Sequence, residues 1–552
     1  MARMFWLFAN YMGHMLRTLT LSANNGPAGL PPLSQRLYDA LTMLLRPTTL
    51  LLLATCYVVY RIVYKLAFSP LCRVPGPLRA RVSSLPSLLE CLTQCTNDVM
   101  VRDSRLYGSL FVMEPKKVAV CDVEDCRTIL GSHAFAKAEL YGNVDFMEPN
   151  IFLTRDAKLN SQRRRQIGPA LNKAGLRRME PTILAAGVQQ LMSRWDSCVH
   201  QAAGARAQVN YYSDMTLMSF DIIASLGFGM EHRSLTTGDR TIGDWVEKTF
   251  ALMILQMVVP AVKWWPLRRI VGAVLGKHVD AFFAFGKQAI ERRKLALATA
   301  SASAEPRPND ILQQFIDAED PLNRIKMTSS QVITETIMIM LSGADTTSTS
   351  LAWTIHLLML YPEHRQALVE QIRAAFGRDQ LITYEMAREH LPLLEACIFE
   401  SLRVCPVSTN LPRVVPKGGV TLQGHFIPGG YTLAVSTAAC NYNPQYWPDP
   451  ARFDPARFLR SNPDYDTNRH NLMTLSSGVR SCPGHQLVMV EMMTTLANIL
   501  NRYDLELPAD AHYGPHNLGA DGLPTVMPRT NHIAMIPKHP ERDCSVVVSM
   551  RP

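Results

Sequence analysis

A long helix near the middle of the chain gives the clearest pattern of apolar and polar positions. Between Ser330 and Leu360, apolar residues occupy most faces of the helix. A Thr-Ser-Ser run at positions 328–330 offers hydroxyl groups for its N-cap. A helix that is apolar on most faces crosses the interior of a large domain. The sequence therefore predicts a buried helix here.

The centre of this helix is interrupted by the polar turn Ser342-Gly-Ala-Asp-Thr-Thr347. Glycine costs about 1 kcal/mol inside a helix, and Asp and Thr side chains compete there for backbone hydrogen bonds. The flanks at 337–341 and 351–353 are apolar. A polar notch between buried flanks predicts a functional groove, and a solvent-exposed polar turn is the alternative.

Shorter runs predict the remaining elements. Leu106–Val112 and Lys117–Cys121 are rich in strand formers and are separated by a Glu-Pro turn, which predicts a hairpin. Asp122–Tyr361 is predominantly helical in pattern, and the polar stretch Ala298–Asn309 predicts a surface loop. The pattern as a whole predicts a mainly α protein with small β-sheets, in the α+β class.

An apolar segment, Thr48–Phe68, stands near the N-terminus. About 20 helical residues cover roughly 30 Å, the thickness of the hydrocarbon layer, and Arg61 and Lys65 can extend to the interface. A proline-rich stretch follows, and arginines at 73, 79 and 81 favour a cytosolic main domain. We therefore expect a membrane-anchor region over residues 1–69, with a transmembrane helix at about 48–68, and a globular domain over 70–552. A buried core helix is the alternative.

The earlier apolar run, Met4–Leu16, is too short to span a bilayer. It either lies at the membrane interface or belongs to a second insertion signal. A cleaved secretory peptide is disfavoured, because the long apolar segment comes later and lacks a clear cleavage site.

Composition and charge narrow the class of protein. The 552 residues are 47% hydrophobic and 19% charged, which is ordinary for a globular protein with an anchor. The net charge of +9 is spread along the chain without a dense basic stripe, so nucleic-acid binding is not expected. The twelve cysteines are scattered without zinc-site spacing, which favours a reducing compartment.

The most informative chemistry lies near the C-terminus, in Leu475-Ser-Ser-Gly478-Val-Arg480-Ser-Cys482-Pro-Gly484. The two glycines allow a sharp turn and a close approach to a flat ligand. Arg480 can hold an anionic group and help to keep the sulfur ionised. The helix-like run that follows also favours a thiolate at its start. The pattern indicates a thiolate that reaches a metal from a tight loop.

This segment resembles the haem-binding loop of the cytochrome P450 family, Phe-x-x-Gly-x-Arg-x-Cys-x-Gly, with Leu475 in place of Phe. The resemblance implies that Cys482 is the axial ligand of a haem b iron, and that Leu475, Gly478, Arg480 and Gly484 contact the cofactor. The turn at 342–347 resembles the family's oxygen-binding signature. By that resemblance Gly343 gives room for dioxygen, Thr346 hydrogen-bonds it, and Asp345 supplies protons.

Two further segments resemble family motifs. Glu400-Ser-Leu-Arg403 lies in a segment similar to the K-helix, and Arg457 matches the arginine of a Pro-Glu-Arg-Phe segment whose Glu is Ala456 here. The resemblance implies a buried charge cluster with a structural role. The run Ile533–Pro537 resembles the final strand of the fold.

Arginines that resemble the family's haem-propionate ligands are Arg164, Arg413 and Arg480. Asn160 stands where the family has a tryptophan before the first of these. For the adjacent Arg163 and Arg165, a helix face exposed to solvent is as good an explanation as a functional role. The basic stretch Arg155–Arg178 is also a candidate for docking an acidic redox partner.

Together these resemblances imply a microsomal, fungal-type cytochrome P450 monooxygenase in the membrane of the endoplasmic reticulum, with its catalytic domain, 70–552, in the cytosol. They imply that the substrates are O2 and a lipophilic specialised metabolite such as a terpenoid or polyketide. The electrons are expected to come from NADPH through NADPH–cytochrome P450 reductase, with cytochrome b5 as a further candidate donor. The pocket is expected from segments 136–150, 212–228, 407–411 and 524–527, with Ala344. A thiolate-haem isomerase or dehydratase of oxygenated lipids, or a non-enzymatic membrane scaffold, is the alternative.

Overall fold

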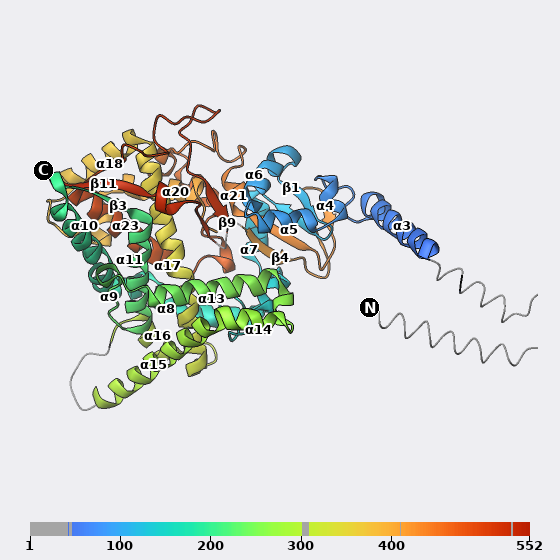
Figure 1. The fold of residues 1–552 in the computed structure, drawn as a ribbon, viewed down its shortest axis with the longest axis horizontal. Helices are drawn as coiled ribbons and strands as arrows, with labels where there is room; N and C mark the ends of the chain where they lie inside the picture. Colours follow the sequence, from blue (N-terminus) through green and yellow to red (C-terminus); the bar gives the residue numbers. More distant parts are fainter. Residues whose placement is uncertain (1–41, 43–46, 301–307, 409, 532–533, 552) are drawn as a thin grey trace, which may run out of the picture. The chain divides into compact units, whose positions relative to one another are not determined.

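Residues 42, 47–300, 308–408, 410–531 and 534–551 are described by the computed structural model, which forms two compact units, 1–72 and 73–552 (Figure 1). In the first unit α3 (Pro47–Val63) continues into the π-helical turn η1 (Tyr64–Phe68). Of the described residues, this helix is long and apolar enough to cross a membrane, and none of it is buried. The run Met4–Leu16 lies outside the described residues.

The second unit is mostly helical, as the pattern predicts. Its main helices are α4 (Leu78–Val82), α5 (Leu85–Leu92), α6 (Thr96–Tyr107), α7 (Val123–Gly131), α8 (Ala157–Leu171), α9 (Lys173–Ile183), α10 (Gln189–Gln201), α11 (Tyr211–Phe228), α13 (Thr241–Val258), α14 (Leu267–Val271), α15 (Lys277–Ala300), α16 (Ile311–Asp317), α17 (Ser329–Leu360), α18 (Pro362–Ala375), α19 (Tyr384–His390), α20 (Pro392–Val404), α21 (Thr437–Asn441), α22 (Tyr465–Asn471) and α23 (His485–Arg502).

The strands form four small sheets. A four-stranded sheet has the order β1-β2-β7-β4, a three-stranded sheet the order β3-β11-β8, and two pairs are β10-β9 and β5-β6. Only β2 and β7 pair in parallel among these strands of the described chain. Their bounds are β1 (Leu110–Glu114), β2 (Lys117–Val120), β3 (Arg206–Asn210), β4 (Asn410–Val414), β5 (Val420–Leu422), β6 (His425–Ile427), β7 (Thr432–Ser436), β8 (Tyr503–Glu506), β9 (Arg529–Asn531), β10 (Met535–Pro537) and β11 (Ser545–Met550).

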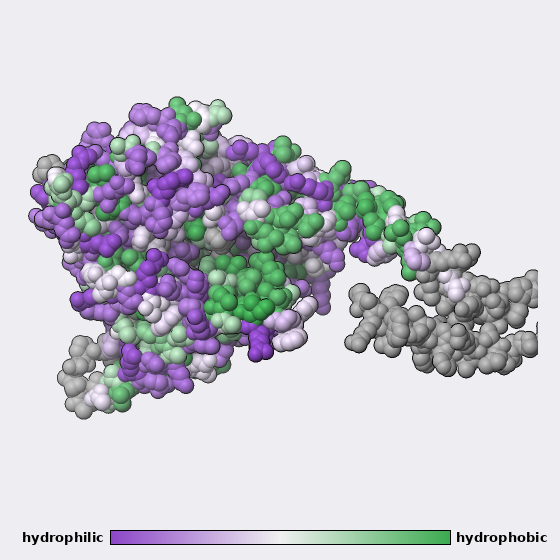
Figure 2. Space-filling model, viewed as in Figure 1, coloured by the Kyte–Doolittle hydropathy of each residue, from purple (hydrophilic) through white to green (hydrophobic). Residues whose placement is uncertain are grey.

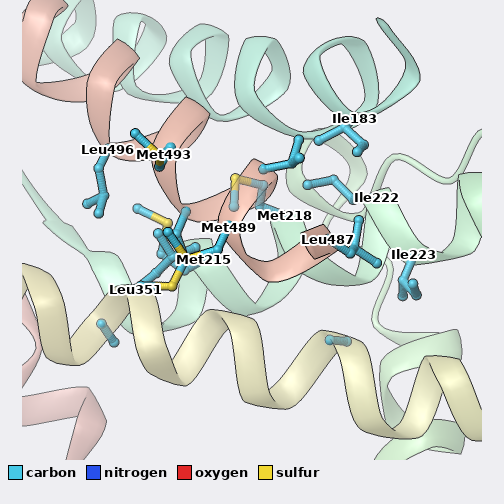
Figure 3. Close-up of a cluster of buried hydrophobic side chains, with 14 of the residues drawn as sticks. Ile183, Met215, Met218, Ile222, Ile223, Leu351, Leu487, Met489, Met493 and Leu496 are labelled. Carbon is cyan, nitrogen blue, oxygen red and sulfur yellow. The ribbon is translucent and has the colours of Figure 1, made fainter. Parts of the chain in front are cut away.

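The central helix is confirmed within one residue. α17 begins at Ser329, and Thr328 caps it through a reciprocal capping box with Gln331. It packs against α11, α13, α15, α20 and α23. Figure 3 shows side chains of α11 and α23, among them Met215, Met218, Met489 and Met493, meeting beside α17. This core fixes the position of the polar turn.

The predicted strands need three corrections. The hairpin exists, but its first strand begins at Leu110 instead of Leu106, because α6 continues to Tyr107 and ends at Gly108 with φ 92°. The predominantly helical stretch also contains β3. The run ending at Pro537 forms β10, yet it is not the last strand, because β11 follows and pairs with both β3 and β8.

Candidate active site

The cysteine loop is a compact turn that leads into α23. The backbone N–H of Cys482 donates to Leu475 O at 2.9 Å, which closes the loop on itself. Gly478 has φ 57°, and a Cβ placed there would lie 2.6 Å from Gly131 Cα at the end of α7. A side chain at position 478 would therefore clash with backbone, so glycine is required on both conformational and steric grounds.

Opposing effects act on the pKa of the Cys482 thiol. Burial raises its pKa, whereas the N–H groups of Gly484 and His485 and the charge of Arg164 act in the opposite direction. Arg164, on α8, also donates to Ser481 O at 2.8 Å, so it binds the loop beside the sulfur. Coordination to a metal deprotonates such a thiol, and the surrounding donors then stabilise the thiolate.

A cluster of buried and half-buried arginines lies in and beside this loop. None of the three nitrogens of the Arg480 guanidinium has a hydrogen-bond partner among the described residues, and the same holds for Nε of Arg164 and of Arg413. Burial, together with the charges of Arg413 and Arg164, lowers the pKa of Arg480 to about 10. Buried donors without acceptors are costly. The site therefore fits a ligand with two carboxylates, as haem has.

Lys137 completes the cluster and was not identified from the sequence. It is 6% exposed and donates to Ile151 O at 2.8 Å. A β-bridge pairs its backbone with Arg413, and burial, with Arg413 next in effect, holds its pKa well below the usual range. A single lysine in a loop carries no sequence signal, and only its pairing with β4 reveals its place among the arginines.

The polar turn of α17 is accessible between two buried stretches of the helix. Ser342 is exposed and Gly343, Asp345 and Thr346 are partly exposed, while 334–341 and 347–360 are buried. The helix nevertheless continues through the turn, and Thr346 Oγ1 donates to Ser342 O at 2.5 Å. Burial, with the Glu247 carboxylate on α13 second, raises the pKa of Asp345 to about 6. A carboxyl group whose pKa lies close to neutral pH can both take up and release a proton, which suits it to proton transfer.

Gly343 is turned toward α11. A Cβ built at Gly343 would make an ordinary contact with Ile223 Cδ1 of α11, at 3.4 Å. The missing side chain therefore leaves space on the side of α11, and this contact does not explain the space that was expected for dioxygen. α11 itself lies in the core, with most of its side chains buried against α17 and α23. The expectation that 212–228 lines the substrate pocket therefore does not agree with this packing.

A sequence model of the family described as Cytochrome P450 matches residues 93–523. The chain belongs to the cytochrome P450 family. Cytochromes P450 are oxidoreductases that hold haem through a cysteine thiolate and incorporate oxygen. The expected fold, enzyme class and haem cofactor are thus confirmed.

Named relatives of this cytochrome P450 are fungal. The cytochrome P450 monooxygenase helB1 of Aspergillus fumigatus is 38% identical over 496 residues, covering 89% of this chain and 84% of the relative. The monooxygenase helB3 of the same species is 38% identical over 494 residues, covering 89% and 96%. Among solved structures, the haem domain of cytochrome P450DA superposes with a TM-score of 0.70 at 17% identity, over 84% of this chain and 95% of that one, which shows the shared fold.

The expected charge cluster of this cytochrome P450 is present. Arg403 donates to both carboxylate oxygens of Glu400 at 2.8 Å, and Arg457 Nε lies 3.4 Å from Glu400 Oε1. Both Glu400 and Arg403 are fully buried. Ala456 is exposed, so the missing glutamate of the motif leaves no buried gap.

The arginine run on α8 is less exposed than a solvated face would be. Arg163 is 2% exposed and lies 3.2 Å from Glu335 of α17, and Arg165 binds Asp320 through two hydrogen bonds. Asn160, in the tryptophan position, donates to Ile151 O at 3.0 Å. These contacts anchor α8 to α17, to the segment after α16 and to the loop that precedes α8.

Proposed function

We propose that this cytochrome P450 inserts one oxygen atom of O2 into a lipophilic specialised metabolite, such as a terpenoid or polyketide, with electrons from NADPH through a reductase. The observation that carries the proposal is the presence together of a cysteine loop, arginines with unpartnered buried nitrogens, and an acid and an alcohol on an accessible turn of α17. The fungal relatives, named monooxygenases, support it.

The residues of the chain would have separate roles in this reaction. Haem bound through Cys482 supplies the activation of O2. Arg480, Arg164, Arg413 and Lys137 would hold the carboxylates of the cofactor and set its orientation. Asp345 would carry a proton to Thr346, whose hydroxyl would release Ser342 O and pass the proton on toward the haem side of α17. Cys482 to Gly484 would keep water away from the sulfur.

The substrate would lie beside the accessible turn of α17. α13 packs against α17, and its end contacts the loop after α7, since Asn143 donates to Met257 O and Gln256 accepts from the Asp145 N–H. We therefore place α13 and residues 139–153 around the substrate, in place of α11. Their largely apolar side chains suit a lipophilic molecule.

The electron donor would approach on the outer side of the cysteine loop. His485, the first residue of α23, has its pKa lowered by burial and then by the charges of Arg469 and Lys173, so cations gather here. Exposed basic residues of the neighbouring segment are Arg155, Lys158, Lys173, Arg177 and Arg178. They would attract an acidic reductase or cytochrome b5.

Replacing Thr346 by alanine is expected to uncouple the reaction. Without the hydroxyl, protons reach oxygen less selectively, and we expect product formed per NADPH to fall about tenfold while peroxide release rises, within the range of general acid–base effects. The substrate for the assay comes from comparing metabolite extracts with and without the enzyme by mass spectrometry. NADPH use, peroxide and product are then measured.

Thr347→Ala is the matched control, because Thr347 is the adjacent threonine but is buried on another face of α17. Its coupling should equal that of the wild type. Unchanged coupling in Thr346→Ala would remove Thr346 from proton delivery. Product without NADPH or O2 consumption in the wild type would instead favour an isomerase or dehydratase.

We also propose that residues 1–69 anchor the protein in the endoplasmic reticulum membrane and that 70–552 is the catalytic domain in the cytosol. The apolar helix Pro47–Phe68 supports this assignment. The second unit also carries exposed apolar side chains, among them Trp264 and Trp265, which are 71% and 79% exposed, and Ile270 of α14. Figure 2 shows a hydrophobic patch over the α13–α14 region. Such a patch is suited to a membrane surface.

Deleting residues 47–68 is expected to move most of the protein from a carbonate-resistant membrane fraction to a carbonate-extractable one. The remaining apolar patch would give only peripheral binding, which alkaline carbonate removes. Immunoblots of both fractions from microsomes measure the result. A full-length protein that carbonate extracts completely would contradict the transmembrane assignment.

A further inference from the structure

His133 lies where α7 meets the cysteine loop. It follows Gly131 by two residues, and Gly131 is the residue that Gly478 approaches most closely. The Nε2 atom of His133 lies 3.1 Å from Ser161 Oγ on α8. Its other nitrogen, Nδ1, is buried and has no hydrogen-bond partner in the described part of the chain.

The surroundings of the ring are cationic. After burial, the charges of Arg480 and Arg164 are what lower the pKa of His133, so both guanidinium groups are near it. Ser161 stands one helical turn before Arg164 on α8, which places the partner of the ring and this arginine on one face. The unpartnered Nδ1 and the unpartnered nitrogens of Arg480 thus share one cationic neighbourhood beside the cysteine loop. One ligand rich in acceptors would satisfy them all.

The side-chain amide of Asn160 binds the protein backbone instead of such a ligand. It occupies the position of the family's tryptophan, but its amide donates to Ile151 O and its Oδ1, an acceptor, is buried without a described partner. An indole donor, which the family has at this position, is therefore missing from α8, whereas His133, whose ring contacts Ser161 on the same helix, has an unpartnered nitrogen.

We propose that His133 Nδ1–H donates a hydrogen bond to a haem carboxylate, and that Ser161 orients the ring for it. The Ser161 hydroxyl donates to Ala157 O at 2.9 Å, and Nε2 of His133 is a second acceptor within its reach, at 3.1 Å. When the hydroxyl donates to Nε2, the hydrogen of the neutral ring lies on Nδ1. This inference rests on haem binding by Cys482, and it does not depend on the substrate.

The test is the rate at which the full-length ferric protein in detergent loses haem to excess apomyoglobin, followed by the Soret band. We expect His133→Ala to lose haem about tenfold faster, as for a lost hydrogen bond to a charged acceptor. His133→Asn keeps an N–H near the position of Nδ1 and should stay within about threefold of wild type. Ser161→Ala leaves His133 in place, and its rate of haem loss should lie between those of His133→Ala and His133→Asn.

The carbon monoxide spectrum of each reduced variant separates this inference from the haem assignment. All variants should keep the wild-type band, because Cys482 is unchanged, and a wild type without that band would overturn the haem site itself. Equal haem-loss rates in His133→Ala and wild type would overturn the role of His133. Equal acceleration in His133→Ala and His133→Asn would show packing in place of donation, and it would also overturn the proposal. If His133→Ala does not fold, wild-type retention in Ser161→Ala overturns it.

Discussion

Replacing Cys482 by serine is expected to abolish monooxygenase activity, by at least about 10³-fold, or about 4 kcal/mol of transition-state stabilisation. A serine hydroxyl is not ionised at neutral pH and does not replace the soft, electron-rich thiolate that favours O–O cleavage. The loop should still fold, because its closing bond joins the backbone N–H of residue 482 to Leu475 O. The buried cations should still hold some haem.

The measurement is the difference spectrum of the reduced protein with and without carbon monoxide, together with NADPH-dependent product formation in microsomes. The variant should lack the thiolate band but remain in the membrane fraction. Cys198→Ser is the control, because Cys198 on α10 is also a half-buried free cysteine. Full turnover by the Cys482 variant would overturn the ligand assignment.

Local signals made much of the site predictable. The capping residues before Ser329 and the apolar run after it located α17 within one residue, because a cap and a helical repeat act over a few positions. The glycines of the cysteine loop pointed to close backbone approach for the same reason, although the partner, Gly131 on α7, could not be read from the loop itself.

Contacts between distant segments were not predictable. Lys137 lies among the arginines only because the chain after α7 pairs with Arg413 of β4. His133 lies near the cysteine loop because the same chain contacts Ser161 of α8, which is 28 residues away. β11 lies beyond the strand taken as the last one, since its partners are strands that no local pattern names. α11 has an apolar sequence that suits a pocket wall or a core equally, and its packing decides for the core.

The Glu400–Arg403–Arg457 charge cluster depends both on a local sequence signal and on contacts between distant segments. ExxR spacing places Glu400 and Arg403 on one face of α20, but the structure shows what their burial requires. The five N–H groups of Arg403 meet two oxygens of Glu400 and the carbonyls of Asn441, Pro450 and Arg452, at 2.8–2.9 Å. Asn441 in turn accepts from Met473 N and donates to Thr474, which precede the cysteine loop.

Replacing Glu400 by alanine is therefore expected to lower the free energy of unfolding by about 3–5 kcal/mol, the cost of leaving a buried charge without its partner. Arg403 would keep its carbonyl acceptors but lose both carboxylate bonds, Arg457 would lose its ion pair, and the N–H of Asp454 would lose its acceptor. The strain would reach the cysteine loop through Asn441. Urea titration of the full-length protein, followed by the Soret band, measures the change.

Glu395→Ala is the matched control, because Glu395 lies on the same helix and pairs with Arg460, which is 65% exposed, at 3.6 Å. A pair with one exposed partner contributes about 0–1 kcal/mol, so this variant should unfold within that margin of the wild type. Glu400→Gln keeps the shape but not the charge, and it should fall between the two alanine variants. Equal midpoints for Glu400→Ala and Glu395→Ala would show that the buried cluster does not hold the cysteine loop in place.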